Sequence, residues 1–429
     1  MRREPGIKWL FMDLNSYFAS VEQQENPNLR GKPVIVTPMQ TDYTCAIAAS
    51  YEAKAYGIKT GTMVSDAKNM CPNLHCVQAQ HDTYVAYHNR IIEEVVKHTP
   101  INRIWSIDEL SSRIPPAKRT ANGAQKIAKK IKDGLHENIG EAINCSIGFA
   151  PNSLLAKIAC EMHKPDGLTI LRQEDLPHKI LHLQLTDIPG IGKNIKKRLN
   201  TSRIYTVEDF WNISPKHARK IWGSVAGERF WYLIHGYDIE PQETNTSLFG
   251  HSRVLDPDLR TPEKARLIAR KLTSKAAKRM RSKEYYAQNI SLSVRTKNNY
   301  KSNRCCKIYA AQDTFTLIQF IDGMWYEILQ EIQNNDANFL RNNSIKKVSI
   351  SLSNLIKKED ITDEIFHTKI RENLDIEEHK NALTHAIDSL QQKYKKDVVS
   401  LGTCPKTSAG FVGTKISFSR VPDAEEFWS

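Results

Sequence analysis

Three carboxylates lie in or next to apolar segments, where acidic side chains are unusual. Asp13 stands near the end of the apolar run at residues 7–14, and Asp108 and Glu109 follow the segment 105–107. A carboxylate in a buried strand is costly unless something compensates its charge. Oxygen donors of this kind suit Mg²⁺, which retains several waters and takes further ligands from substrate phosphates. If the three acids meet, they form a magnesium site for a phosphorylated substrate.

Asp108 and Glu109 can share an ion only in one local structure. Adjacent residues of a flat strand face opposite sides, so the pair must lie in the turn of a hairpin, with residues 110–114 as the return strand. The alternative is a hairpin tip whose acids face solvent. A single Asp-Glu pair does not decide between the two.

Length and charge narrow the class of protein. The 429 residues suggest roughly three domains. Lys and Arg outnumber Asp and Glu by 61 to 48, a formal charge of +13. This surplus favours a polyanionic partner, with nucleic acid the first candidate and an acidic membrane surface the second. No segment approaches the roughly 18 apolar residues of a spanning helix, and Asp13 interrupts the first apolar run too early for a signal peptide. We therefore expect a cytoplasmic protein without a membrane partner.

Apolar periodicity predicts strands and helices in the first part of the chain. Strands are expected at residues 7–14, 32–37, 103–114 and 143–148. Helices are expected after Asn15 or Ser16, at 50–56 and 124–135, and after Asn152, which can cap the helix that follows it. Residues from about 170 to 240 are predicted to be helical throughout.

A second unit is predicted after a polar linker at residues 242–246. The pattern runs strand, helix, strand, strand, helix, strand, over 247–255, 262–282, 288–296, 304–310, 315–334 and 344–352. This βαββαβ order is typical of a split, ferredoxin-like layer of sheet and helices. One face of its strands is apolar and the other is small and polar, which suits phosphates rather than bases.

Two basic segments are candidate contacts to nucleic acid. Residues 188–193 form a glycine turn at the start of a helix, where backbone N–H groups can bind phosphate, and basic residues surround it: Lys193, Lys196, Lys197 and Arg198. The helix at 262–283 carries nine basic residues against one acid, Glu263. A run of charged residues usually marks a solvated helix face, but a ratio of nine basic residues to one acid favours a surface that binds a polyanion.

The motifs together resemble those of the Y-family, or lesion-bypass, DNA polymerases, in particular the bacterial group of the mutagenesis polymerase subunit and DNA polymerase IV. Residues 11–22 (FMDLNSYFASVE) resemble the opening motif, 50–58 (SYEAKAYGI) the fingers motif and 106–109 (SIDE) the catalytic signature. Residues 146–159 and 163–167 (HKPDG) match the end of the palm, and 189–192 (PGIG) the thumb. Five matches in order are far more specific than any one of them.

The resemblance implies an α+β multidomain protein with the right-hand architecture of a polymerase. The palm would comprise residues 1–25 and 76–167, and small fingers residues 26–75. A helical thumb with a helix-hairpin-helix would span 168–241, the βαββαβ block at 247–355 would be the DNA-binding little finger, and 356–429 would be a C-terminal extension.

The resemblance also assigns roles to residues. Asp13, Asp108, Glu109 and the backbone carbonyl of Leu14 would bind two Mg²⁺ ions, with Mn²⁺ as a substitute. The deoxynucleoside triphosphate would contact Tyr17, Phe18, Tyr51, Lys54 and Lys164, and the ring of Phe18 would be the steric gate against ribose. Lys54 stands where the family usually has Arg, so it offers a point charge in place of a bidentate fork.

The expected macromolecular partners are primer–template DNA, the sliding clamp and mutagenesis accessory proteins. DNA would contact the thumb and little finger at Gly190, Gly192, Lys193, Lys196, Lys197, Arg270, Lys271 and Arg295. The tail offers residues 362–366 (TDEIF) as a clamp peptide anchored by Ile365 and Phe366, although Thr362 replaces the usual Gln. The alternative for this segment is a loop or a helix start.

These features predict a template-directed DNA polymerase of low fidelity that performs translesion synthesis, in DNA repair or an SOS-type damage response.

One departure from the family's sequence pattern supports an alternative function. The strand after the Asp-Glu pair is usually apolar, but here it contains Ser111 and Ser112 and is followed by Pro115 and Pro116. The alternative is therefore a non-catalytic or partner-dependent DNA-binding subunit of a mutagenesis complex on the same fold.

Overall fold

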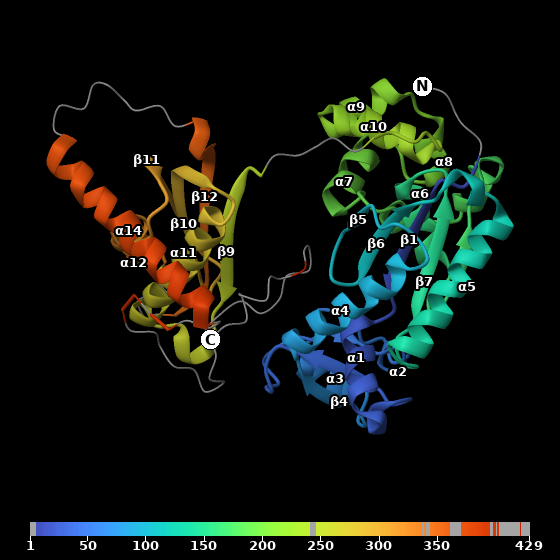
Figure 1. Ribbon diagram of the computed structural model, residues 1–429, viewed down its shortest axis with the longest axis horizontal. Helices are drawn as coiled ribbons and strands as arrows, with labels where there is room; N and C mark the ends of the chain where they lie inside the picture. Colours follow the sequence, from blue (N-terminus) through green and yellow to red (C-terminus); the bar gives the residue numbers. More distant parts are fainter. Residues whose placement is uncertain are drawn as a thin grey trace. The chain divides into compact units, whose positions relative to one another are not determined.

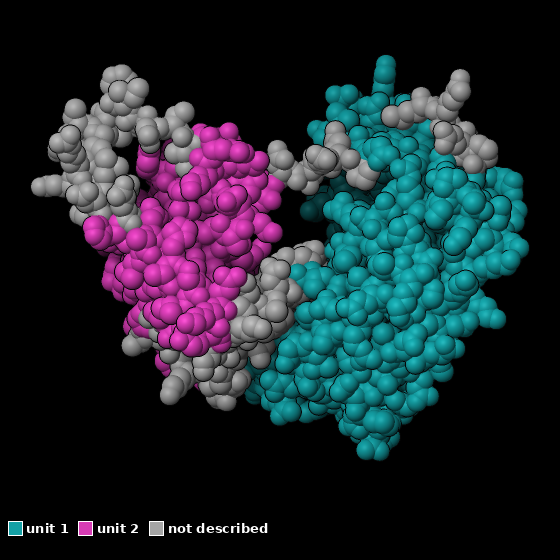
Figure 2. Space-filling view, in the orientation of Figure 1, with its two compact units in different colours: residues 1–242, 416–422 teal, residues 243–415, 423–429 magenta. Residues whose placement is uncertain are grey.

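The computed structural model describes residues 6–240, 246–336, 339, 344–360, 370–394, 398–399, 401–402 and 421. The chain divides into two compact units, residues 1–242 with 416–422 and residues 243–415 with 423–429 (Figures 1 and 2). No described helix has the length and apolar character needed to cross a membrane.

A five-stranded sheet in the order β5-β6-β1-β7-β8 forms the centre of the first unit. Its strands are β1 (Trp9–Leu14), β5 (Arg103–Ile104), β6 (Glu109–Arg113), β7 (Cys145–Ala150) and β8 (Leu168–Ile170). β1 is buried along its whole length, as its apolar sequence on both faces requires. Leu10 and Met12 belong to one hydrophobic core, whereas Trp9 and Phe11 belong to the other. By this alternation Asp13 faces the same side as Trp9 and Phe11.

Three helices cover this sheet (Figure 1). Residues of α4 (His81–Val96) and α5 (Ala121–Asn138) pack in the core of Leu10 and Met12. α6 (Ser153–Met162) packs in the core of Trp9 and Phe11. The predicted cap is confirmed, because the Asn152 side chain accepts a bond from the Leu155 N–H at 2.9 Å. Asp13 therefore lies on the side of the sheet that α6 covers.

The strand that follows the Asp-Glu pair is complete despite its serines. β6 pairs with β1 in unbroken register from Asp13↔Glu109 to Trp9↔Arg113. Ser111 and Ser112 are fully buried but satisfied: Ser111 Oγ accepts from Trp105 Nε1 at 2.9 Å, and the Ser112 hydroxyl bonds to Thr99 and to the Pro100 carbonyl. Hydrogen bonds thus replace apolar packing here, and the hairpin is intact.

A small sheet follows α1 (Tyr17–Glu25) in the chain. Its order is β3-β2-β4, with β2 (Val34–Thr37), β3 (Ala48–Ala49) and β4 (His75–Gln78). α2 (Tyr51–Lys54) and α3 (Val64–Met70) belong to the same part of the chain and share its core, which includes Ile35, Ala53 and Val64.

The remainder of the first unit is helical, as predicted. Three 3-10 turns, η3 (Gln173–Asp175), η4 (His178–Ile180) and η5 (Leu185–Asp187), precede α7 (Lys193–Thr201), α8 (Val207–Asn212), α9 (Pro215–Trp222) and α10 (Val225–Ile234). Asn152 joins these helices to α6, because its amide donates to the carbonyls of Leu233 and Tyr237 at 2.6 and 2.9 Å.

The second unit confirms the predicted βαββαβ order. Its elements are β9 (Leu248–Val254), α11 (Pro262–Arg281), β10 (Tyr285–Thr296), β11 (Lys301–Ala311), α12 (Thr314–Asn335) and β12 (Ile345–Lys357), and the sheet order is β11-β10-β12-β9. Alternate residues of β10 and β12, such as Ile290, Leu292 and Val348, form one core with both helices. The other face of the sheet carries the polar residues.

A further helix, α14 (Ile370–Tyr394), packs on α12. It also contacts α11, because the Arg281 guanidinium makes a bidentate ion pair with Asp388 at 2.7 and 2.9 Å. The Arg281 side chain is buried and donates as well to the Gln312 carbonyl at 2.8 Å. This arginine therefore stabilises the unit internally.

Candidate active site

Two carboxylates meet at the edge of the β1–β6 pair. Asp13 lies directly opposite Glu109 in the register of these antiparallel strands. Asp108 precedes β6, in the turn that follows β5, and its carbonyl accepts from the Leu14 N–H at 2.9 Å. Leu14 is itself buried beside them. The predicted hairpin thus brings Asp13, Asp108 and Glu109 to one end of the sheet.

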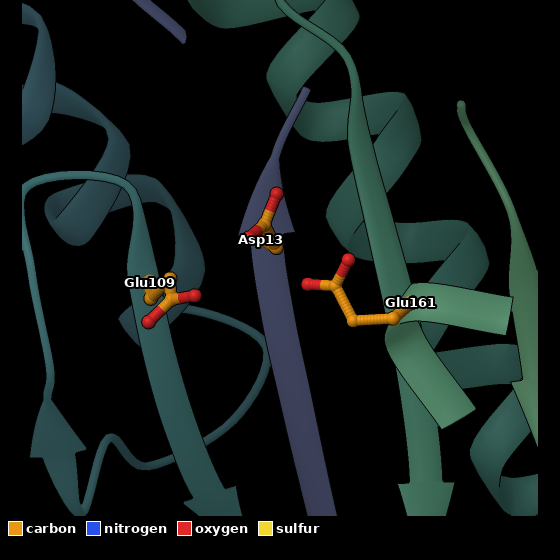
Figure 3. Close-up of side chains that lie close together, drawn as sticks. All are labelled: Asp13, Glu109 and Glu161. Atoms are coloured by element: carbon orange, nitrogen blue, oxygen red, sulfur yellow. The ribbon is translucent and has the colours of Figure 1, made fainter. Parts of the chain in front are cut away.

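A further acid, Glu161 from the last turn of α6, joins this group. Carboxylate oxygens of Asp13, Glu109 and Glu161 all lie within 4.8 Å of one another, with Asp13 between the other two (Figure 3). Sequence reasoning missed Glu161. The available signal was the spacing of Lys157 and Glu161, which at an interval of four lie on one face of an otherwise apolar helix, with Lys164 just beyond its end.

Two lysines pair with the three acids of the cluster. Lys164 Nζ lies 2.7 Å from Asp13 Oδ1 and 2.7 Å from Glu161 Oε1. Lys157 Nζ lies 2.6 Å from Glu109 Oε1. The acids and lysines come from β1, β6, α6 and the residues after α6, so the site depends on how this helix crosses the sheet.

Burial and pairing act in opposite directions on the charges. Burial raises the pKa of Asp13 to about 7, although the Lys164 ammonium lowers it. Burial lowers the pKa of Lys164, but the carboxylates of Asp13 and Glu161 outweigh this effect and raise it above its usual value. Lys164 is therefore charged over the whole physiological pH range, whereas Asp13 gains a proton readily.

Asp108 differs from the other acids in its partner. Its carboxylate accepts from the Ser106 hydroxyl, and it does not belong to the close group of Asp13, Glu109 and Glu161. Burial raises its pKa, the Ser106 hydrogen bond lowers it and the charge of Glu109 raises it further.

The donor set fits Mg²⁺ or Mn²⁺. All donors are carboxylate oxygens, the ligand type these hard cations prefer. Oxygens of one octahedral shell lie up to about 4.2 Å apart, twice the Mg–O distance. The carboxylate oxygens of Asp13 and Glu109 lie within 4.8 Å of each other, which is close to this value, so both can serve one ion.

Tyr51 and Lys54, both on α2, lie near Ser16 at the start of α1 and within electrostatic reach of Asp13. Lys54 Nζ donates to Ser16 Oγ at 2.8 Å and lies 4.2 Å from the centre of the Tyr51 ring. Ser16 occupies the N-cap position of α1 with φ of 50°, but its side chain does not cap that helix. Burial and the charge of Lys164 both lower the pKa of Lys54, which places these two cations within electrostatic reach of each other.

Tyr17 and Phe18 are mostly buried, at 3% and 8% exposure. The Tyr17 hydroxyl donates to the Tyr84 carbonyl at 2.6 Å. Phe18 stacks on the Tyr84 ring with the ring centres 4.5 Å apart. Both aromatic residues therefore contribute to the core that contains Leu10 and Met12.

A glycine turn precedes α7, and one side of this helix lines a basic hollow of about 510 Å³ formed by Lys193, Lys196, Lys197, Asn200, Thr201 and Tyr205. Gly190 has φ of +101°, and a Cβ there would lie 3.0 Å from the Phe230 ring. Gly192 is the N-cap of α7, with open space where a side chain would stand. The backbone can thus approach a ligand closely at this helix start.

The basic helix α11 is not a single free surface. Arg266 pairs with Asp322 at 2.8 Å and Arg281 with Asp388, and Arg270 and Lys271 are only half-exposed.

On the polar face of the sheet, by contrast, Arg295 lies directly opposite Lys301 on β11 and Lys347 on β12. Ile365 and Phe366 lie outside the described residues.

Sequence comparisons agree with this architecture. The chain matches the impB/mucB/samB family over residues 12–161 and the C-terminal domain of that family over residues 248–364. It is 33% identical to DNA polymerase IV of Moorella thermoacetica over 67% of this chain and 72% of the relative. It is 27% identical to DNA polymerase IV of Oceanobacillus iheyensis over 91% and 90% of the two chains.

Solved structures share the fold. A Y-family DNA polymerase chimera superposes with a TM-score of 0.67 at 22% identity, covering 82% of this chain and 99% of its own. An insertion ternary complex of Dbh DNA polymerase superposes with a TM-score of 0.52 at 24% identity, with the same coverage. The expected right-hand polymerase fold is confirmed, and the chain belongs to the impB/mucB/samB family of Y-family DNA polymerases.

Proposed function

We propose that this protein elongates a DNA primer opposite a template strand and continues past damaged template bases. The observation that carries the proposal is the meeting of Asp13 and Glu109 across β1 and β6, with Asp108 in the adjoining turn. In this assignment residues 1–25 and 76–167 are the palm, 26–75 the fingers, 168–241 the thumb and 247–355 the little finger.

Each part of the site has a distinct role in the proposed reaction. Asp13, Asp108, Glu109 and the Leu14 carbonyl would hold two Mg²⁺ ions, whose chemistry is to activate the primer hydroxyl and stabilise the departing pyrophosphate. Tyr51, Lys54 and Lys164 bind the triphosphate; the proximity of the two lysine charges supports this role. Phe18, held against Tyr84, excludes a ribose 2′-hydroxyl, and Tyr17 packs beneath the incoming nucleotide.

Two surfaces would hold the DNA. The first comprises the glycine turn at Gly190 and Gly192, where the start of a helix suits a phosphate, and the hollow lined by Lys193, Lys196 and Lys197. The second is the polar face of the β9–β12 sheet. Like charges directly opposite one another destabilise a sheet, so the row of Lys301, Arg295 and Lys347 favours a polyanionic partner.

A non-catalytic DNA-binding subunit is the alternative, and the intact hairpin removes its main support. Primer extension by the purified protein with Mg²⁺, on an undamaged template and on one with an abasic site, separates the two. The polymerase proposal expects extension on both templates. DNA binding without extension on either would favour the alternative.

Recruitment by a sliding clamp through Ile365 and Phe366 is a further part of the proposal. This part rests on the apolar-aromatic pair in the sequence. A role for accessory mutagenesis proteins is also proposed, and it rests on the resemblance to the family.

A further inference from the structure

Glu161 has no role in the reaction assigned above, yet it lies inside the acid cluster. It stands in the last turn of α6, where the helix dipole disfavours a carboxylate. Its side chain is 40% exposed, so burial of this side chain does not account for its position in the cluster. Its position is explained by its partner, the Lys164 ammonium at 2.7 Å.

Lys164 connects Glu161 to the acids of the sheet. The same ammonium lies 2.7 Å from Asp13 Oδ1, so one lysine bridges a carboxylate of β1 and a carboxylate of α6. A divalent cation bound at Asp13 would compete with the ammonium for that oxygen. The two cations repel each other, which favours the release of Lys164 from Asp13 when the cation binds.

We propose that Glu161 is a positioning residue that holds Lys164 when Asp13 binds a divalent cation, so that lysine and metal do not compete for one carboxylate. The inference rests on the proposed polymerase function. With Glu161 present, Lys164 keeps an anionic partner after it leaves Asp13 and remains beside the site where it meets the triphosphate. Without Glu161, Asp13 becomes the anion that retains the ammonium, and metal binding weakens.

Mn²⁺ binding to the full-length protein, measured by electron paramagnetic resonance without DNA or nucleotide, tests this inference. The titration is run at about pH 8, where a carboxyl of raised pKa has lost its proton. Glu161→Gln should weaken binding about 10- to 100-fold, as loss of an outer partner of a metal ligand commonly does. Glu161→Asp should retain most of the affinity, and the surface control Glu174→Gln, whose residue pairs with Arg172, should match wild type.

A double-mutant cycle separates positioning from direct ligation. In a Lys164→Met background, Glu161→Gln should weaken Mn²⁺ binding much less than it does in the wild-type background, because only the direct effect of its charge remains once the lysine is gone. Equal weakening in both backgrounds would show that Glu161 acts on the metal directly, as a ligand or through its charge, and would overturn the inference. Unchanged affinity in the single variant would also overturn it.

The same preparations distinguish this inference from the proposed function. Wild-type protein that extends a primer, combined with no effect of Glu161→Gln on Mn²⁺ binding, would refute the role of Glu161 alone. Wild-type protein that binds Mn²⁺ but extends no primer would refute the polymerase function and leave the coupling of Glu161 to Lys164 standing as a property of the cluster.

Discussion

Asp13 and Glu109 lie directly opposite each other across β1 and β6, in an arrangement where like charges destabilise a sheet. A separate lysine compensates each of them: Lys164 lies 2.7 Å from Asp13 and Lys157 lies 2.6 Å from Glu109. The fold therefore concentrates negative charge at one point and offsets part of it with two lysines. Departures from local stability rules of this kind are expected at functional sites.

Metal binding should depend on pH through Asp13. Because burial raises the pKa of this carboxyl to about 7, it carries a proton at lower pH, and the proton competes with the metal. We expect Mn²⁺ affinity to rise roughly tenfold per pH unit up to about pH 7 and to level off above it, one proton being released per ion bound. A flat profile between about pH 6 and 8 would show that Asp13 is already ionised throughout.

DNA binding should be strongly salt-dependent and nearly indifferent to sequence. Replacing Arg295, Lys301 and Lys347 together by Ser should reduce the log–log slope of affinity against salt by up to about 2.7, or 0.9 for each phosphate that is no longer neutralised. The control is Arg172→Gln, which removes an exposed charge paired with Glu174. An unchanged slope in the triple variant would exclude this face of the sheet as the DNA surface.

Substitution of Phe18 should admit ribonucleotides. Because Phe18 stacks on Tyr84 at 4.5 Å, Phe18→Ala also costs roughly 3–5 kcal/mol of stability, so Phe18→Leu is measured beside it. The readout is the ratio of ribonucleotide to deoxynucleotide incorporation, which does not depend on the folded fraction. Tyr17→Phe, which removes only a hydroxyl bonded to the Tyr84 carbonyl, is the control. If the ratio stays at the wild-type value in both Phe18 variants, this ring is only a core residue.

Clamp recruitment should depend on Phe366. Loss of an aromatic anchor usually costs over about 2 kcal/mol, or about thirtyfold in affinity. We expect Phe366→Ala to impair synthesis stimulated by the clamp and to spare synthesis without it. Thr362→Gln should tighten clamp binding, because the polar part of the pocket regains its hydrogen-bond partner. Unaltered clamp affinity in both variants would assign recruitment to another segment.

Local patterns predicted the elements that carry the site. The apolar run of β1 predicted a central strand, and the opposite-face rule for adjacent residues predicted that Asp108 and Glu109 lie at a hairpin turn. The buried serines of β6 were harder to interpret, since their partners are distant in sequence: the Trp105 indole bonds to Ser111, and Thr99 bonds to Ser112.

Contacts between elements distant in the chain could not be predicted in this way. Lys157 meets Glu109 across 48 residues, and this contact depends on where α6 crosses the sheet. The ratio of basic to acidic residues in α11 counts only the residues of that helix. The acids that pair with Arg266 and Arg281 lie 56 and 107 residues away in the chain, so the ratio could not include them. A DNA-binding role for Arg270 and Lys271 stays a prediction.

The most direct test of the account is single-nucleotide addition to a primer in Mg²⁺ by wild type, Asp13→Asn and Glu109→Gln, with DNA affinity measured on the same preparations. The account predicts addition by wild type, a loss of at least about 10²- to 10³-fold in both variants, and nearly unchanged DNA affinity, because other surfaces bind the phosphates. Glu174→Gln should behave as wild type. Addition at the wild-type rate by both Asp13→Asn and Glu109→Gln would contradict the assignment of these acids to the catalytic centre.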